Sequence, residues 1–216
     1  NVHLLLGTTD VTWQDNPKYY NAAVLVDPKG ETVGIYHKQH LVPFGEYVPF
    51  RKLLSFVSPL VESVGGFSAG DGPVMMMMDG QPIGAIVCYE MIYPGLVRQF
   101  VRNGSRLLAT VTNDAWYGRT AAPHQHFQQA TMRAIEHGRY VVRAANTGIS
   151  GVIDPYGRVL SATNLFEDDV LTSEVKLIQE LTPYARYGDL LAFGCGIFTL
   201  VLLSMAVAPN MRSSSD

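Results

Sequence analysis

The feature that most constrains the fold is a short apolar run, residues 83–87, which ends at Cys88 and is followed by Glu90 and a helix-like segment. A β-rich apolar run of this length, bounded by turn residues, is typical of a strand covered on both faces of a sheet. Open α/β sheets place their reactive groups at the carboxyl ends of such strands. Cys88 therefore stands where a nucleophile is useful, although a lone cysteine is more often a small buried apolar side chain.

The charge balance and the cysteines exclude several classes of function. A chain of 216 residues with a net charge of −3 forms one or at most two domains and has no basic footprint for nucleic acid. Cys88 and Cys195 lie too far apart for zinc spacing, and we expect no disulfide between them.

Two histidine pairs are candidates for metal ligands. His37 and His40 flank Lys38, and His124 and His126 flank a glutamine, but neither pair has a cysteine or carboxylate at metal-ligand spacing. We therefore expect surface or helix N-terminal positions for these histidines, and no metal or other cofactor.

Residues 190–208 contain no charged side chain. As a helix, this run is long enough to cross a hydrocarbon core of about 30 Å. A soluble helix of this length normally shows a polar face, so we expect a C-terminal transmembrane helix, with a buried core helix as the alternative. Arg186 and Arg212 lie on opposite sides of the run, so charge does not orient it.

The remaining pattern alternates short apolar runs with one amphipathic segment. It predicts strands over residues 2–7, 20–27, 32–38, 83–88, 106–112, 150–154, 158–162 and 170–175, and helices over residues 96–101 and 124–145. Strands and helices in this order predict a layered α/β sandwich, not a doubly wound nucleotide-binding fold.

Residues 39–73 show no periodicity but carry many apolar side chains, among them Phe44, Phe50 and Phe56. A long irregular segment in a compact domain is usually a functional lid or a disordered insert. Its apolar content favours a lid that covers a lipophilic site or touches a membrane. The four methionines at residues 75–78 are expected to pack in the core or against lipid, not to bind a soft metal.

Three predicted strand ends carry groups suited to thiol chemistry: Lys38, Cys88 and Asn113 with its neighbour Asp114. A nearby ammonium lowers the pKa of a thiol and offers hydrogen bonds to the oxyanion formed on an attacked carbonyl. Two carboxylates lie close by in sequence. Glu90 has three possible positions: on the same face as Cys88, hydrogen-bonded to the lysine, or in the first turn of the following helix. Glu46 is either a supporting carboxylate or a solvent-exposed surface charge.

Four motifs carry a family resemblance. They are YHKQHLVPFGEYVP at residues 36–49, IVCYE at 86–90, TNDAWYG at 112–118 and LTPYAR at 181–186. Together the motifs resemble the apolipoprotein N-acyltransferases, membrane-embedded members of the nitrilase (carbon-nitrogen hydrolase) superfamily.

The resemblance implies a partial nitrilase-like α-β-β-α sandwich followed by one transmembrane helix. The catalytic domain is expected over residues 1–180 with its lid at 39–73, followed by a connector at 181–189, the membrane helix at 190–208 and a tail at 209–216.

The resemblance also implies roles for individual residues. Cys88 is expected to be the nucleophile and Lys38 the lysine of a Glu-Lys-Cys triad. Glu46 and Glu90 are expected to support them, and the backbone N–H of Tyr89 to join Lys38 in the oxyanion hole. The residues expected to line the substrate site are Asn113, Trp116 and Phe44.

The implied reaction moves a phospholipid acyl chain to the cysteine as a thioester, and then to the α-amino group of a diacylglyceryl-cysteine in an apolipoprotein. The partners are therefore a phospholipid, an apolipoprotein and the membrane, without nucleic acid or cofactor. The implied location is the bacterial inner membrane, with the catalytic domain facing the periplasm.

One departure from the family concerns the triad glutamate, which precedes the strand with which this chain begins. We therefore expect the sequence to be a C-terminal part that is inactive alone. Two alternatives stay open: a membrane-anchored nitrilase-type amidase, and a non-catalytic lipid- or lipoprotein-binding protein.

Overall fold

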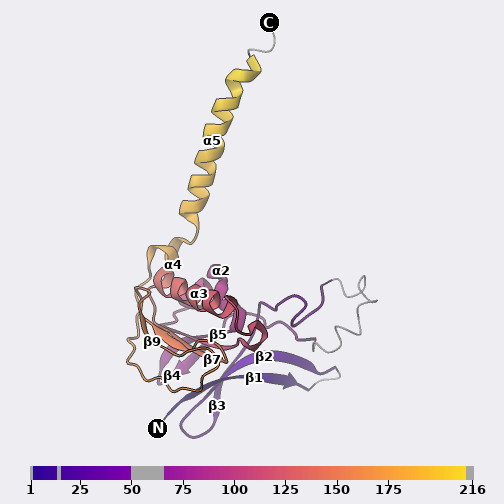
Figure 1. The fold of residues 1–216 in the computed structure, drawn as a ribbon, viewed down its shortest axis with the longest axis vertical. Coiled ribbons are helices and arrows are strands. Elements are labelled where there is room, and N and C mark those ends of the chain that lie inside the picture. The colour runs from indigo at the N-terminus through magenta and orange to yellow at the C-terminus, as the bar shows by residue number, and fades with distance from the viewer. Residues whose placement is uncertain (1, 14–15, 50–65, 213–216) are drawn as a thin grey trace.

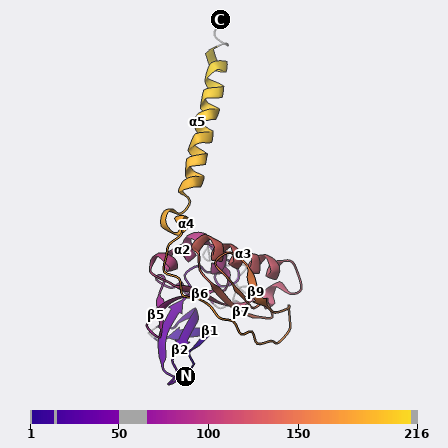
Figure 2. The same cartoon turned by 90° about the vertical axis from the view of Figure 1, so that its left-hand side faces the viewer.

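The computed structural model describes residues 2–13, 16–49 and 66–212, with side chains as far as residue 206. Two sheets of three and six strands lie face to face, and helices α2 and α3 cover the outer face of the larger sheet (Figure 1). The view from the side shows the same layers in the same order (Figure 2). The predicted layered α/β sandwich is confirmed.

The smaller sheet is an antiparallel meander of β1 (Leu4–Thr12), β2 (Lys18–Val26) and β3 (Thr32–His37). The turn between β2 and β3 is closed by Asp27, whose Oδ1 accepts hydrogen bonds from the backbone N–H groups of Lys29 and Glu31, both at 2.9 Å. Lys38 follows directly after β3 and therefore lies at the edge of this sheet.

The larger sheet has the strand order β4-β5-β6-β7-β8-β9. Its strands are β4 (Met75–Met78), β5 (Gln81–Val87), β6 (Leu107–Asn113), β7 (Val141–Asn146), β8 (Gly151–Ile153) and β9 (Val159–Ala162). The central strands β5, β6 and β7 run parallel, whereas β4, β8 and β9 are antiparallel to their neighbours. Parallel strands end at the same edge of a sheet, so Cys88, Asn113 and Asn146 are brought to one edge.

Apolar side chains fill the space between the layers. Ala23 and Tyr36 from the smaller sheet belong to the same buried cluster as Met76 and Ile86 from the larger one. On the other face, α2 (Pro94–Arg102) and α3 (Ala122–His137) bury an apolar stripe that includes Phe100. Met76 is a core residue, as expected for the methionine run.

The helix predicted over residues 124–145 is too long. α3 ends at His137 because Gly138 adopts a left-handed conformation, with φ 59°, and its N–H caps the helix. Residues 141–146 form the parallel strand β7. Small and apolar residues at three- and four-residue steps continue across this boundary, so periodicity alone did not reveal it.

Residues 170–175 were predicted as a strand but form no ladder. The chain just after them is held by a backbone bond from the Ile178 N–H to the Arg106 carbonyl, and by Arg139, which donates to the carbonyls of Gln179 and Glu180. The carbonyls of residues 179 and 180 are thus bound by an arginine side chain and not by a neighbouring strand.

Part of the predicted lid, residues 50–65 with Phe50 and Phe56, lies outside the described residues. Both flanks of the predicted lid are held by backbone hydrogen bonds. The N–H of Phe67 donates to the Glu46 carbonyl, and the N–H of Gly70 donates to the Lys38 carbonyl. A Cβ at Gly70 would lie 2.3 Å from the His37 carbonyl oxygen, so this close crossing requires glycine.

The chain ends in α4 (Pro183–Tyr187) and α5 (Leu190–Arg212), which projects from the sandwich (Figure 1). A helix needs about 20 predominantly apolar residues to cross the hydrocarbon core of a bilayer. Within the described residues, no helix is both long and apolar enough to do so. The prediction of a transmembrane helix over residues 190–208 is therefore not supported.

Candidate active site

Cys88 lies at a sharp turn where β5 ends and the 3₁₀-helix η2 (Cys88–Ile92) begins. Its φ is +54°, a left-handed backbone conformation that residues other than glycine rarely adopt. Such strain persists only where the surroundings enforce it, and it is concentrated at functional sites. The turn places Cys88 at the edge of the sheet, half-buried and without a disulfide partner.

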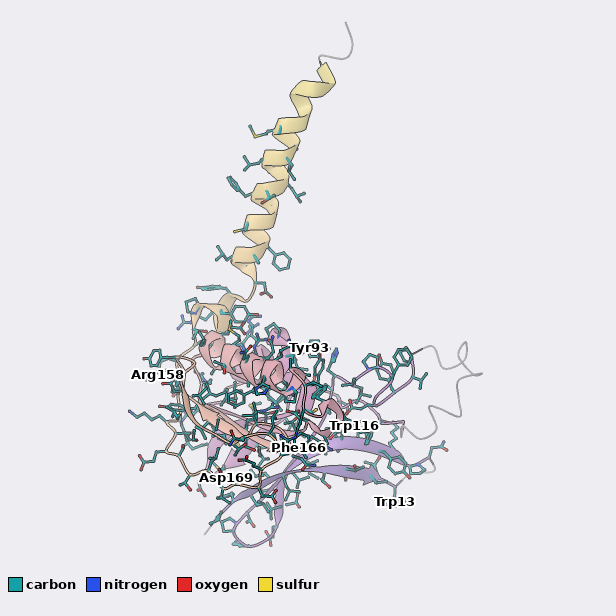
Figure 3. All side chains as sticks on the ribbon, viewed as in Figure 1. Trp13, Tyr93, Trp116, Arg158, Phe166 and Asp169 are labelled. Carbon is teal, nitrogen blue, oxygen red and sulfur yellow. The ribbon has the colours of Figure 1, made fainter. Side chains whose placement is uncertain are left out.

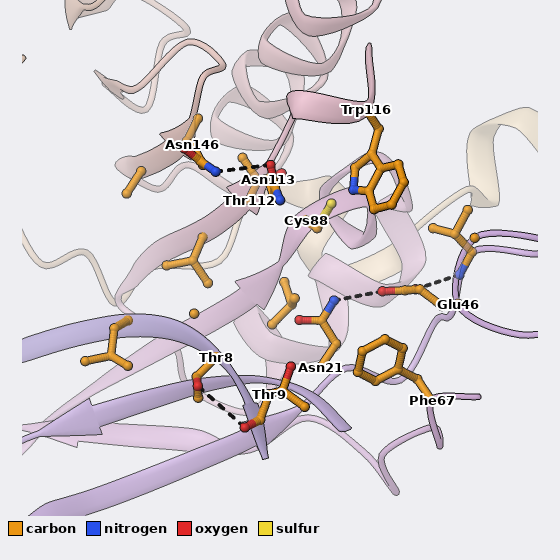
Figure 4. A pocket seen from close by; sticks show the side chains of 18 of the residues that line it. Thr8, Thr9, Asn21, Glu46, Phe67, Cys88, Thr112, Asn113, Trp116 and Asn146 are labelled. Atoms are coloured by element: carbon orange, nitrogen blue, oxygen red, sulfur yellow. Dashed lines mark hydrogen bonds between the residues drawn. The ribbon is translucent and has the colours of Figure 1, made fainter. Parts of the chain in front are cut away.

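A cavity of about 920 Å³ opens beside Cys88. It lies between the two sheets, and Figure 4 shows Cys88 with Trp116 and Asn113 around it. The lining is mostly apolar and includes Leu5, Leu6, Val42, Phe44, Phe67, Val87, Val111, Ala144 and Ala145. A space of this character suits a hydrocarbon chain better than a charged group.

Lys38 and Glu46 form a buried ion pair next to this cavity. The Nζ atom of Lys38 lies 2.9 Å from Oε1 and 2.8 Å from Oε2 of Glu46. Lys38 is only 1% exposed, and Glu46 lines the cavity. Glu46 is therefore a partner of the lysine and not a solvent-exposed surface charge.

Glu46 is held in place from two further directions. The side-chain amide of Asn21 donates to Oε1 at 2.7 Å, and the backbone N–H of Val42 donates to Oε2 at 2.8 Å (Figure 4). Asn21 was missed by the sequence reasoning, because nothing near residue 21 indicates a carboxylate 25 positions further along the chain.

Glu90 is fully buried, but it does not bind Lys38. Its Oε1 accepts hydrogen bonds from the hydroxyl of Tyr36 and from the backbone N–H groups of Gln39 and His40, and its Oε2 accepts from the N–H of Val87. Burial raises the pKa of Glu90 despite these four bonds. Glu90 thus ties the end of β3 to the turn at Cys88, and the lysine-holding alternative is wrong.

The other predicted residues lie at the rim of the cavity or beside the turn. Asn113, Trp116 and Phe44 all line the cavity. Trp116 is 84% exposed and Phe44 is 64% exposed, and Figure 3 shows Trp116 at the surface. Tyr89 packs edge-on against Tyr93, with ring centroids 6.0 Å apart.

A buried polar cluster of Asp114, His126 and Arg143 lies behind the turn and was not predicted as a unit. All three residues are at most 3% exposed, so the surface position considered for His126 is wrong. Its place on the buried stripe of α3, four residues before Ala130, was the signal that could have shown its burial. Burial alone would raise the pKa of Asp114, but its interaction with the His126 ring and the charge of Arg143 hold it below its usual value.

Burial also acts on Tyr117, another residue that lines the cavity. It raises the pKa of the Tyr117 hydroxyl to about 12, and the neighbouring Cys88 contributes in the same direction. The tyrosine is therefore a neutral hydroxyl at physiological pH. Among residues 2–13, 16–49 and 66–212, no group of three or more histidine, cysteine or carboxylate side chains is arranged to hold a metal ion.

Two relatives share much of the sequence. Apolipoprotein N-acyltransferases from Geobacter metallireducens and Methylococcus capsulatus are 47% and 42% identical over 189 and 195 residues. These alignments cover 88% and 89% of this chain, which spans only 36% and 38% of the relatives' own lengths. The resemblance to these proteins that the four motifs predicted is confirmed.

Solved structures share the fold at low identity. An amidase of the nitrilase superfamily from Nesterenkonia matches with a TM-score of 0.55 and 21% identity, over 76% of this chain and 58% of the amidase chain. A carbon-nitrogen hydrolase from Helicobacter pylori matches with a TM-score of 0.57 and 18% identity, over the same shares of both chains. The family model described as carbon-nitrogen hydrolase covers residues 1–182. With this match over most of its length, the chain belongs to the carbon-nitrogen hydrolase family.

Proposed function

We propose that the protein containing this chain is an apolipoprotein N-acyltransferase that works through a thioester on Cys88. The observation that carries the proposal is the buried Lys38–Glu46 pair, whose Glu46 lines the same mostly apolar cavity as Cys88 at its strained turn. The similarity to named N-acyltransferases supports the choice of reaction.

In the first step the Cys88 thiolate attacks the ester carbonyl of a phospholipid. A C–S bond forms, and the carbonyl oxygen becomes an oxyanion. An ammonium carries three N–H groups. Because the two hydrogen bonds that the Lys38 ammonium makes to the described residues both go to Glu46, it can direct another N–H toward this oxyanion, together with the backbone N–H of Tyr89. Collapse then breaks the C–O bond, and the lysophospholipid oxygen leaves with a proton.

In the second step the α-amino group of the acceptor attacks the thioester. The C–N bond forms, the C–S bond breaks, and the amine proton returns the cysteine to its thiol form. The base that accepts the thiol proton is proposed to lie in the rest of the protein. Glu46 is already bound by Lys38, Asn21 and Val42, and Glu90 by four other donors, so neither is free for that task.

We also propose a catalytic part of the chain, the partners of the protein and its location. The catalytic part is residues 1–180, and the partners are phospholipid and a diacylglyceryl apolipoprotein. The proposed location is the bacterial inner membrane, with the catalytic part facing the periplasm. The proposal of a membrane location, though not of its orientation, is supported by the apolar side chains that α5 exposes, such as Leu191 and Phe193.

The test uses the complete protein in liposomes, with a phospholipid labelled in its acyl chain and a synthetic diacylglyceryl-cysteine peptide. We expect label on the α-amino group of the peptide, none with Cys88→Ala, and an unchanged rate with the matched control Cys195→Ser. Release of the label only as free fatty acid would favour a hydrolase instead. Label transfer by Cys88→Ala would remove the proposal.

A further inference from the structure

The backbone carbonyl of Cys88 is held by a side chain from another element. The Nε2 atom of His126, on α3, lies 3.3 Å from this carbonyl oxygen. A carbonyl oxygen is only an acceptor, so Nε2 must carry a proton and donate it. This contact joins the covering helix α3 to Cys88, which has a left-handed backbone.

The other ring nitrogen of His126 has a suitable partner in either charge state. Its Nδ1 lies 3.1 Å from Oδ1 of Asp114 and 3.1 Å from Nη2 of Arg143. A neutral ring accepts from the arginine, and a protonated ring donates to the carboxylate. The proton on Nε2, and therefore the bond to the Cys88 carbonyl, is kept in both states.

Asp114 and Arg143 are themselves fixed from several sides. Nη2 of Arg143 lies 2.6 Å from Oδ2 of Asp114, Nε of Arg143 donates to the Ile149 carbonyl, and the hydroxyl of Thr112 donates to Asp114. The backbone of Gly148 also packs closely against Asp114, since a Cβ at Gly148 would lie 2.4 Å from Oδ2 of Asp114. The ring of His126 is thus backed by a buried ion pair with little freedom to move.

The carbonyl of Cys88 and the N–H of Tyr89 belong to one planar trans peptide, so they point in opposite directions. Holding the carbonyl toward His126 therefore fixes the direction of the Tyr89 N–H away from α3. We propose that His126, backed by Asp114 and Arg143, is a positioning residue that aligns the Tyr89 N–H as an oxyanion donor. This inference rests on the proposed nucleophilic role of Cys88.

The test compares two reactions of Cys88 in the complete protein, both followed by mass spectrometry of the peptide that contains it. With p-nitrophenyl butyrate the thiolate attacks a carbonyl, an oxyanion forms, and p-nitrophenolate leaves. With iodoacetamide the C–S bond forms as iodide leaves, and no oxyanion arises. At about pH 9 an ordinary thiol is largely ionised, so neither reaction needs a general base.

His126→Asn and His126→Gln form a matched pair. Asparagine can still face Asp114 and Arg143 but is too short to reach the Cys88 carbonyl, whereas the amide of glutamine reaches the position of Nε2. We expect His126→Asn to slow acylation by about 10- to 100-fold, the scale of a misplaced catalytic group, and to leave alkylation within about threefold. His126→Gln should restore most of the acylation rate.

A parallel loss of both reactions in His126→Asn would show a merely structural role and overturn the inference, as would unchanged acylation. If His126→Asn does not fold, Arg143→Lys replaces it. That variant keeps the charge facing Asp114 but loses the bond to His126, so the same selective loss of acylation is expected. A wild-type protein that reacts with the ester but never with phospholipid would defeat the proposed function and leave the positioning role intact.

Discussion

At the scale of single residues, the ammonium of Lys38 depends on a single carboxylate, because it is buried and its hydrogen bonds to the described residues all go to Glu46. Removing one partner of a buried pair leaves the other charge without compensation. We therefore expect this pair to stabilise the fold, in addition to its proposed part in the reaction.

Glu46→Gln should lower the free energy of unfolding by about 3 kcal/mol, the scale of a broken buried ion pair. Urea unfolding measures this loss. The matched control is Glu31→Gln at the exposed turn after β2, where a change within about 0.5 kcal/mol is expected. Equal stability of both variants would show that Lys38 finds another partner or becomes neutral.

His137 is a second buried group with a measurable consequence. Neither of its ring nitrogens has a hydrogen-bond partner among the described residues. Burial, together with the charges of Arg133, Arg139 and Arg98, lowers the pKa of His137 from 6.5 to about 3. Between these two pKa values the unfolded chain binds a proton at His137 that the folded chain does not bind. The neutral His137 therefore makes its full contribution to the free energy of unfolding above about pH 6.5, and this contribution is lost as the pH falls toward 3.

Between pH 7 and pH 5, this group alone should remove about 2 kcal/mol of stability. His137→Phe keeps an aromatic ring against Tyr184 and cannot titrate. From pH 7 to pH 5, the free energy of unfolding of this variant should therefore fall by about 2 kcal/mol less than that of the wild-type protein. Urea unfolding at both pH values checks this difference. Equal acid sensitivity of the two proteins would mean that His137 takes up a proton in the folded state.

Residue-level prediction from the sequence worked where a residue ends a strand, and failed where two residues meet only in space. Cys88 and Lys38 follow β5 and β3 directly, so the ends of the apolar runs located both. Which carboxylate holds the lysine depends on a loop that folds back over the sheet edge, and spacing alone does not reveal this. Asn21 was missed for the same reason, because it meets Glu46 only in space.

At the scale of elements, the boundary between α3 and β7 depends on Gly138. Its left-handed backbone stops the helix, and the small residues that follow fit a buried parallel strand as well as a helix face. Residues 170–175 show a different error. Their β-branched side chains predicted a strand, but these residues pair with no strand of the sheet. Element type depends on tertiary position in both cases.

Gly138→Ala should destabilise the protein by about 1–2 kcal/mol, because the added Cβ penalises the left-handed backbone. That atom would also lie 2.9 Å from Cγ2 of Thr182. The control is Gly95→Ala on α2, where open space surrounds the position and stability should stay equal or rise slightly. Thermal unfolding distinguishes the two, and a harmless Gly138→Ala would mean that another residue ends α3.

At the scale of the whole molecule, the site exists because two sheets meet. β1 and β2 supply one wall of the cavity, and the carboxyl ends of β6 and β7 supply the other. The order of strands and helices predicted this layered arrangement, and the edge shared by parallel strands explains why residues far apart in sequence converge on Cys88. The shape of the cavity depends on packing between the sheets, which no local pattern specifies.

The most direct measurement is mass spectrometry of the complete protein after incubation with phospholipid alone. Without an acceptor, the acyl group has to wait on the enzyme, so a thioester should accumulate. We predict a hydroxylamine-sensitive acyl adduct on the peptide that contains Cys88, which is absent in Cys88→Ala. An unmodified Cys88 peptide, or an adduct that persists in Cys88→Ala, would contradict the role of Cys88 as the acyl-carrying nucleophile.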